Sequence, residues 1–278
     1  EGEIDLDDLI KEEQTVIALT HFGYIKRMPI DTYRSQKRGG KGITGIATRE
    51  EDFVKQIFTA STHDTILFFT NKGKLYKLRG YEVPEAGRTA RGTAIVNLLS
   101  LDAGEKVSAV IPIQNFAEGK YLLMATKNGL IKKTALAEYN SARKTGLQGI
   151  TLKEDDELIA VRLTDGEDNV VLVTRNGMCI TFDEKDVRPI GRVSQGVIGI
   201  RIDEDDEVIG MESIIAGGKA TLLAITENGF GKRTELDEYR VQIRGGKGVI
   251  TYKVTQKTGK LVGARIATDD EDVMLITD

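Results

Sequence analysis

The chain has 278 residues, of which 40% are hydrophobic and 29% charged, and its formal net charge is −4. This composition is typical of a globular protein, and no apolar run approaches the length of a membrane span, so we expect no membrane partner. Cys179 is the single cysteine, which excludes an internal disulfide and favours a reducing, cytoplasmic location.

The first 13 residues are strongly acidic, with seven acidic side chains and one lysine. A signal peptide carries a basic and then an apolar region, so we do not expect this stretch to be one. It is typical of a segment within a longer polypeptide. The chain then continues as repeats.

A short turn with the pattern Thr-x-x-Gly recurs along the chain. Its glycines are spaced by 50, 56, 48 and 52 residues and are Gly23, Gly73, Gly129, Gly177 and Gly229. Because glycine accepts positive φ angles readily, each turn predicts a tight hairpin. A period of about fifty residues predicts a repeat architecture.

Four strands are predicted in each repeat. The first precedes the turn, the second follows it, the third opens on a glycine after a loop, and the fourth closes the unit. In chain order they are 16–20, 24–30, 42–48 and 53–60; 66–70, 74–80, 92–98 and 107–113; 122–126, 130–136, 149–153 and 158–164; 170–174, 178–183, 196–202 and 207–214; 222–226, 230–236, 248–254 and 261–267. The run at 273–277 begins a sixth unit.

Four short antiparallel strands per unit predict an all-β, propeller-like disc of five to six four-stranded blades. No linker interrupts the period, so residues 1–278 are expected to form one domain, with 1–13 as an acidic N-terminal segment. Ring closure stays open at this point, either as five blades or with a sixth completed by other segments.

Basic residues recur in the loop between the second and third strands. The loop is expected to end at a glycine 19 or 20 residues after the turn glycine, at Gly42, Gly92, Gly149, Gly196 and Gly248. A basic residue stands four positions before that glycine in four units, and Lys144 stands five before it in unit three, whose loop is one residue longer. The four residues are Arg38, Arg88, Arg192 and Arg244.

A second basic position lies three and four residues after the turn glycine. Its members are Lys26, Arg27, Lys77, Lys132, Lys133, Lys232 and Arg233, and unit four has none. Strand neighbours point to opposite faces, so we expect one of each pair to face a ligand and the other to run along its blade.

The net charge of the whole chain is small, but positive and negative side chains lie in different segments. Residues 21–49 carry a net +6, whereas residues 1–13 carry a net −6, and acidic runs at 153–157, 203–207 and 269–272 are expected in solvated turns. Basic, glycine-rich loops suit phosphate groups, because glycine lets the backbone approach and Lys and Arg donate charge-assisted hydrogen bonds. Few aromatic residues accompany them, so we expect contacts to the DNA backbone with little base readout.

The segment from Gln36 to Gly42, QKRGGKG, resembles the seven-residue box in the C-terminal domain of the A subunit of DNA gyrase, and the recurring turns and the stretch STHDTILFFT resemble that family too. The resemblance covers nearly the whole chain. It implies a β-pinwheel whose blades exchange strands, and wrapping of duplex DNA around the rim in support of negative supercoiling. An intact box favours gyrase over topoisomerase IV, whose related domain has a degenerate box or none.

The resemblance also implies the partners: duplex DNA, the remainder of the gyrase A subunit, plus the gyrase B subunit in a bacterial, nucleoid-associated heterotetramer. The domain itself is expected to be non-catalytic and to need no cofactor, since ATP and magnesium belong to other parts of the enzyme. Gln242 to Gly248 forms a second near-box with Ile243 at a basic position. The expected DNA-binding residues are Gln36, Lys37, Arg38, Gly39, Gly40, Lys41, Gly42, Lys26, Arg27, Arg88, Arg91, Lys132, Lys133, Arg143, Lys144, Arg192, Lys232, Arg233, Arg244 and Lys247.

Other functions are compatible with a basic disc. The domain could belong to a topoisomerase IV-like protein that guides DNA, or it could be a propeller that grips an acidic protein. An enzyme would need polar groups converging near the central channel, and the apolar strands predict none there. His21 and His63 are isolated, so no metal site is expected. Tyr139 occupies a position that Val83 and Val187 share in other units, which indicates packing.

Overall fold

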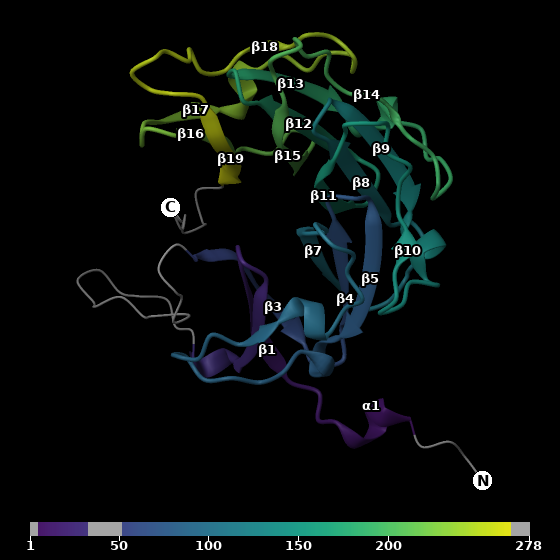
Figure 1. Cartoon of the computed structure of the whole chain (residues 1–278). Helices are drawn as coiled ribbons and strands as arrows, with labels where there is room; N and C mark the ends of the chain where they lie inside the picture. The colour runs from purple at the N-terminus through teal and green to yellow at the C-terminus, as the bar shows by residue number, and fades with distance from the viewer. Residues whose placement is uncertain (1–4, 33–51, 268–278) are drawn as a thin grey trace.

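The computed structural model describes residues 5–32 and 52–267. Almost all regular structure in this part of the chain is β-strand, and the strands form five small antiparallel sheets arranged as blades around a centre (Figure 1). The predicted all-β, propeller-like fold is confirmed. The predicted sixth unit at 273–277 and the predicted strand at 42–48 lie outside the described residues.

Blades one to four share one strand order. Blade one consists of β3 (Val54–Ser61), β1 (Gln14–Thr20), β2 (Tyr24–Pro29) and β6 (Thr93–Ala94). Blade two consists of β7 (Val107–Ile113), β4 (Thr65–Thr70), β5 (Lys74–Arg79) and β10 (Leu147–Gln148). Blade three consists of β11 (Leu158–Thr164), β8 (Tyr121–Thr126), β9 (Leu130–Ala135) and β14 (Val197–Ile198).

Blade four consists of β15 (Val208–Ile215), β12 (Asp168–Thr174), β13 (Met178–Asp183) and β18 (Val249–Ile250). Blade five has three strands within the described residues, β19 (Leu261–Ala267), β16 (Thr221–Thr226) and β17 (Gly231–Glu235). The helices are short: α1 (Leu6–Leu9) and the 3₁₀ turns η1 (Ile30–Thr32), η2 (Gly80–Glu82), η3 (Ile95–Asn97), η4 (Leu136–Tyr139), η5 (Glu184–Asp186) and η6 (Leu236–Glu238).

The recurring Thr-x-x-Gly turn joins the first two strands of each blade. Every turn glycine has a positive φ and donates its N–H to the threonine carbonyl, as Gly129 does to Thr126 at 3.0 Å. In blade three the Thr126 hydroxyl also accepts the N–H of Leu130 at 3.1 Å. The turn therefore needs glycine for its backbone angle and threonine as an acceptor, which explains why both residues recur.

Neighbouring blades exchange strands. The predicted third strands of units two, four and five contract to two residues each, and in unit three the strand is Leu147–Gln148, just before the predicted 149–153. Each of these short strands pairs with the second strand of the preceding unit, as β14 does with β9. The strand exchange between blades that the resemblance implies is therefore confirmed. A strand given to the preceding blade ties consecutive units together and covers an edge that would otherwise be open.

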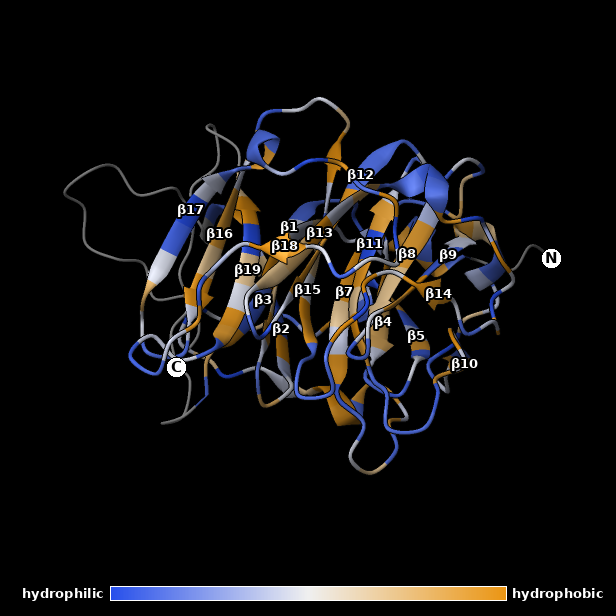
Figure 2. Ribbon diagram, turned by 90° about the horizontal axis from the view of Figure 1, so that it is seen from above, coloured by the Kyte–Doolittle hydropathy of each residue, from blue (hydrophilic) through white to orange (hydrophobic). Residues whose placement is uncertain are grey.

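The core lies between the blades. Ile17 of blade one packs in one cluster with Phe68 of blade two, and Leu123 of blade three packs with Leu172 of blade four. Strands β8 and β11 carry long hydrophobic stretches, whereas β17 is mostly hydrophilic (Figure 2). Strands sandwiched between two blades are buried on both faces, which accounts for the near-continuous apolar runs in the sequence.

The sheets have an inner and an outer edge. The fourth strands β7, β11, β15 and β19 contact one another around the centre. The two-residue strands stand at the opposite end of each sheet, and Figure 1 shows β10, β14 and β18 on the outside of the arc. The strand order thus assigns the segments that lead into these short strands to the outer rim.

Residues 5–13 of the acidic N-terminal segment lie against the outside of the disc, where Figure 1 shows α1. It is bound to the turn that follows β3. Thr62 donates its N–H to the carbonyl of Glu13 at 2.9 Å and its hydroxyl to the carbonyl of Lys11 at 2.8 Å. Asp7 forms an ion pair with Arg79 of β5. The segment is therefore docked on blades one and two.

Candidate nucleic-acid interface

The seven-residue box from Gln36 to Gly42 lies outside the described residues, so the positions of Lys37, Arg38 and Lys41 stay predictions. The equivalent loops of the other four units are described. We call 87–91, 141–145, 191–195 and 243–247 the rim loops, because each leads into one of the outermost strands β6, β10, β14 and β18. The four rim loops therefore lie on one circumference of the disc.

The structure corrects the alignment of unit three. The outermost strand β10 begins at Leu147, directly after Gly146, just as β14 begins after Gly196 and β18 after Gly248. Gly146 has a φ of +98° and Gly196 a φ of +95°, whereas Gly149 has no positive φ. The loop-ending glycine of unit three is thus Gly146, and its loop is shorter than the others instead of one residue longer. Lys144 does not occupy the position of Arg192.

The loop-ending glycines are required by the backbone of the preceding blade. A Cβ on Gly196 would lie 2.6 Å from the carbonyl oxygen of Ile131, and one on Gly92 would lie 2.5 Å from that of Ile25. Both distances are shorter than any normal contact. Glycine is needed here for close approach between blades as well as for its positive φ, and this holds whether or not the loop binds a phosphate.

Arg192 and Arg244 make the same kind of contact. Arg192 donates from Nη1 to the carbonyl oxygen of Gln148 in β10, and Arg244 donates from Nη1 to that of Ile198 in β14 at 3.0 Å. Arg244 also donates from Nε to the carbonyl of Asp186 at 3.0 Å. Each arginine is half-buried as a residue and its guanidinium bridges to the outermost strand contributed by the preceding unit, so two successive rim loops present their arginines in one orientation.

The remaining rim cations are mostly exposed. Arg88, Arg143 and Lys247 are exposed, while Lys144 is exposed and paired with Glu82. Arg91 is half-buried, with its guanidinium 4.0 Å from the centre of the Tyr24 ring. The ring attracts the cation electrostatically, which stabilises this placement of the guanidinium.

The basic residues on the second strands are placed differently. Lys26 and Lys132 are fully buried, and Lys133 is 4% exposed. Their ammonium groups donate to backbone carbonyls, and desolvation by burial lowers the pKa of each, in Lys132 to about 8. In unit three neither lysine faces solvent, so the expectation that one of each pair is turned toward a ligand does not hold there.

The other members of this set vary. Arg27 is half-buried and donates from Nε to the carbonyl of Val83 at 2.9 Å. In blade five both Lys232 and Arg233 are exposed. Lys232 reaches the carbonyl of Thr251 at 3.4 Å, and Arg233 donates from Nε to the hydroxyl of Thr221 at 2.8 Å. Exposure of this pair coincides with the edge of β17, which has no outer partner strand within the described residues.

A family model described as the DNA gyrase C-terminal domain, beta-propeller, matches the chain at residues 14–61, 64–114, 120–165, 168–215 and 220–268. The chain belongs to this family. The A subunit of DNA gyrase from Clostridium acetobutylicum is 56% identical over 276 residues, which are 99% of this chain and 33% of that protein. The chain thus spans about a third of the length of that curated relative.

Two solved structures agree with this gyrase-family assignment. A crystal structure of the C-terminal domain of DNA topoisomerase IV aligns with a TM-score of 0.77 and 30% identity, over 94% of this chain and 79% of that one. A structure of the DNA gyrase A C-terminal domain aligns with a TM-score of 0.76 and 27% identity, over 93% of this chain and 84% of that one. The resemblance drawn from the box and the turns is confirmed.

The acidic turns of this gyrase-family domain are not all solvated. Asp156 and Asp206 are each 9% exposed, and each carboxylate accepts a backbone N–H of the neighbouring hairpin turn, from Asn128 at 3.0 Å and from Asn176 at 2.9 Å. One acid of each of the runs 153–157 and 203–207 therefore caps a turn, which corrects the expectation of purely solvated clusters there, while the run at 269–272 lies outside the described residues. These two runs lie beside the hairpin turns, whereas the rim loops lie along the outermost strands.

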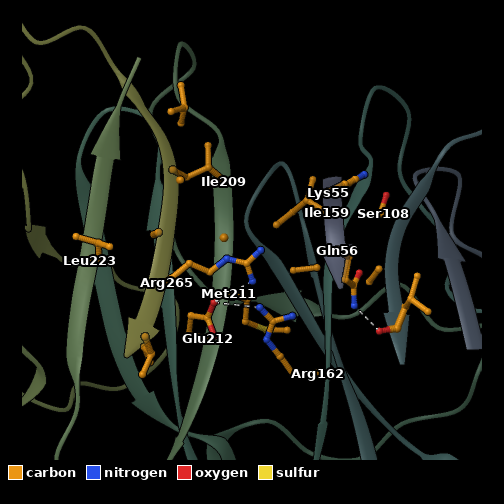
Figure 3. A pocket seen from close by; sticks show the side chains of 18 of the residues that line it. Lys55, Gln56, Ser108, Ile159, Arg162, Ile209, Met211, Glu212, Leu223 and Arg265 are labelled. Atoms are coloured by element: carbon orange, nitrogen blue, oxygen red, sulfur yellow. Dashed lines mark hydrogen bonds and ion pairs between the residues drawn. The ribbon is translucent and has the colours of Figure 1, made fainter. Parts of the chain in front are cut away.

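The central channel does hold polar groups, contrary to the expectation from the apolar strands. It is a cavity of about 630 Å³ lined by the innermost strands. Arg162 donates to Glu212 at 3.0 Å, and Arg265 lies 3.9 Å from the same carboxylate (Figure 3). The three side chains come from β11, β15 and β19, so they link adjacent innermost strands of the gyrase-family disc.

Two side chains that could carry chemistry, Tyr139 and Cys179, are buried in the core. Tyr139 is fully buried, and its hydroxyl donates to the carbonyl of Gly149 at 3.0 Å. Cys179 is buried, and desolvation raises its pKa to about 11, which leaves it a thiol at neutral pH.

Among the described residues no group of three or more His, Cys, Asp or Glu could hold a metal ion. In the same part of the chain, no helix is long and apolar enough to cross a membrane.

Proposed function

We propose that this gyrase-family domain binds duplex DNA along its outer rim without sequence specificity and bends the duplex around the disc. Within a gyrase, such bending would support the introduction of negative supercoils. The observation that carries the proposal is the repeated placement of the rim loops. Basic residues precede four outermost strands on four successive blades, so a duplex that meets them must follow the curvature of the rim.

The energetics favour several contacts over one. Bending a site of 20–30 bp by 40–90° costs roughly 1–6 kcal/mol. Each phosphate contact releases counterions and steepens the dependence of log affinity on log salt by about 0.9. One rim loop could not offset the bend, whereas loops on several blades could at low salt. The proposal therefore requires that the rim loops act together.

The deciding experiment is a plasmid topology assay. A closed circular plasmid is relaxed by a topoisomerase in the presence of the domain at low salt. The change in linking number is measured after the protein is removed. The domain is expected to shift the linking number in proportion to the bound amount. No shift at saturating domain would overturn wrapping.

A matched pair of variants tests whether the rim is responsible. The rim variant replaces the exposed Arg88, Arg143 and Lys247 with Ala, and the control replaces the exposed Lys72, Lys106 and Lys153, which lie beside hairpin turns. Both lose three positive charges. The rim variant is expected to lose most of the linking-number shift and the control to keep it. Equal losses would mean that net charge alone governs binding.

A topoisomerase IV-like role is the second candidate, because the solved topoisomerase IV domain aligns as well as the gyrase domain does. A domain that guides DNA segments without wrapping them would bind duplex DNA but leave the linking number unchanged. A propeller that grips an acidic protein would show a salt dependence unrelated to DNA length. The plasmid assay and a titration against duplexes of increasing length separate the three roles.

A further inference from the structure

We propose that Lys132 and Lys26 are positioning residues, which hold the rim loop of the next unit in place for DNA, and that they do not contact DNA themselves. The role in DNA binding rests on the proposed function, whereas the contacts between the lysines and the rim loops are observed directly. It gives a role to two basic residues that the sequence suggested as DNA contacts and that the structure places in the interior.

In units one to four, the residue three positions after the turn glycine lies beneath the rim loop of the next unit. A Cβ on Gly92 would lie 3.1 Å from the Cβ of Lys26, and one on Gly196 would lie 3.2 Å from the Cβ of Lys132. Tyr76 lies under Gly146 in the same way, and Ile180 under Gly248. Four successive units thus use one position to support the following loop.

Lys26 fills this position with a complete set of hydrogen bonds. Its ammonium donates to the carbonyls of Gly87 at 2.8 Å, Arg88 at 2.9 Å and Ala90 at 3.0 Å. An ammonium has three donors, and all three are used within one rim loop. Burial of a charge is costly without such partners, so these carbonyls and the lysine hold each other in place.

Lys132 makes the equivalent contact in blade three. Its ammonium donates to the carbonyl of Arg192, in the rim loop of unit four, and to the carbonyl of Gly149 at 2.7 Å. Tyr139 donates to that same Gly149 carbonyl, and Glu138 accepts the N–H of Arg192 at 3.3 Å. The charged groups facing the ammonium are Glu138 and Arg192. The backbone of Arg192 is therefore held from both sides while its guanidinium reaches the carbonyl of Gln148 at the rim.

The two other occupants of this position show what the lysines add. Tyr76 donates its hydroxyl to Glu105 at 2.7 Å instead of to the rim loop, and Ile180 has no polar side-chain group. The fold therefore tolerates apolar and aromatic side chains here, and the lysines are not needed to build a blade. The lysines supply hydrogen bonds to the backbone carbonyls of the loop. A loop ordered before binding loses less conformational entropy when DNA binds.

The test measures loop order and DNA binding separately. In Lys132→Ile, which copies the occupant of unit four, amide hydrogen exchange at Arg192 and Ser194 is expected to accelerate at least tenfold. The affinity for a 30 bp duplex is expected to fall about three- to tenfold, with an unchanged slope of log affinity against log salt. In the Arg192→Ala background, Lys132→Ile is expected to add no further loss of affinity, because the loop then presents no guanidinium.

Two controls keep the inference falsifiable. Tyr76→Phe keeps the ring that lies under Gly146 but removes its hydroxyl, whose hydrogen bond goes to Glu105 and not to the rim loop, so exchange at Gly146 is expected to stay unchanged. If Lys132→Ile does not fold, Lys26→Met tests the same role through exchange at Ala90, whose N–H is bonded to the Gly87 carbonyl at 3.2 Å.

The outcomes are distinguishable. Unchanged exchange in the rim loop would overturn the positioning role, and so would a salt slope that falls by about 0.9, because that fall identifies a lost phosphate contact. Failure of the wild-type domain to bind duplex DNA would overturn the proposed function instead. The exchange measurements need no DNA, so the positioning of the loop by lysine is decided independently.

Discussion

Gly196 lies against the carbonyl oxygen of Ile131, so closely that a Cβ on the glycine would be 2.6 Å from that oxygen. This contact joins the rim loop of unit four to the second strand of unit three. It fixes where the exchanged strand β14 begins and thereby where Arg192 stands. A rigid loop at the rim is thus a consequence of how two blades pack.

We predict that Gly196→Ala destabilises the domain by about 1–3 kcal/mol, because alanine is strained at a φ of +95° and its Cβ would collide with the backbone. Urea denaturation followed by circular dichroism measures the change. Gly191→Ala is the control, since its Cβ would lie 3.8 Å from the nearest atom and its φ is not positive. Equal stability of the two variants would contradict the packing argument.

Lys132 is expected to make stability depend on pH. Desolvation lowers its pKa in the folded state to about 8, from 10.5. Between these pKa values the unfolded chain binds more protons than the folded one. Raising the pH through this window therefore stabilises the folded state, by at most about 1.4 kcal/mol per pH unit. Below pH 8 the lysine is charged in both states and the contribution is constant.

Urea denaturation of wild type and Lys132→Met at pH 7.5, 8.5 and 9.5 isolates this effect. The difference in unfolding free energy between wild type and Lys132→Met should move in favour of wild type as the pH rises. Parallel pH profiles for wild type and Lys132→Met would show that the buried ammonium keeps its ordinary pKa.

The buried carboxylate of Glu105 is expected to stabilise blade two. It accepts the hydroxyl of Thr70 at 2.6 Å, the hydroxyl of Tyr76 at 2.7 Å and the N–H of Asp102 at 2.8 Å. Glu105→Gln turns one acceptor into a donor that faces other donors, so we expect a loss of about 1–3 kcal/mol. Thermal unfolding measures the loss, and the exposed Glu154→Gln should leave stability unchanged.

Arg38→Ala is expected to weaken DNA binding more than Arg192→Ala. Arg38 belongs to the intact box, whereas unit four lacks the basic pair on its second strand, and the Arg192 guanidinium already donates to the carbonyl of Gln148. Fluorescence anisotropy with a 30 bp duplex at several salt concentrations compares the two. A larger loss for Arg192→Ala would reverse this ranking of the rim contacts.

Much of the fold follows from local patterns. A buried strand such as β4 is indicated by an unbroken apolar run, and the turn at Thr126 to Gly129 by a threonine acceptor and a glycine with positive φ. These features depend on a few adjacent residues, so the period, the hairpins and the propeller class could be predicted. The recurrence of basic residues before the loop-ending glycine is equally local.

The partners of those elements are not local. A strand of two residues such as β10 has no periodicity, so neither its pairing with the preceding blade nor the true loop-ending glycine, Gly146, could be found by spacing. Whether Lys132 points to DNA or beneath the next loop depends on which edge of its strand is covered. The sequence alone determined the repeated strands, turns and basic loops, because backbone angles and hydrophobic periodicity are set by neighbouring residues. Only the tertiary structure decided which blade receives each strand and which lysines are buried, because both depend on packing between units far apart in the chain.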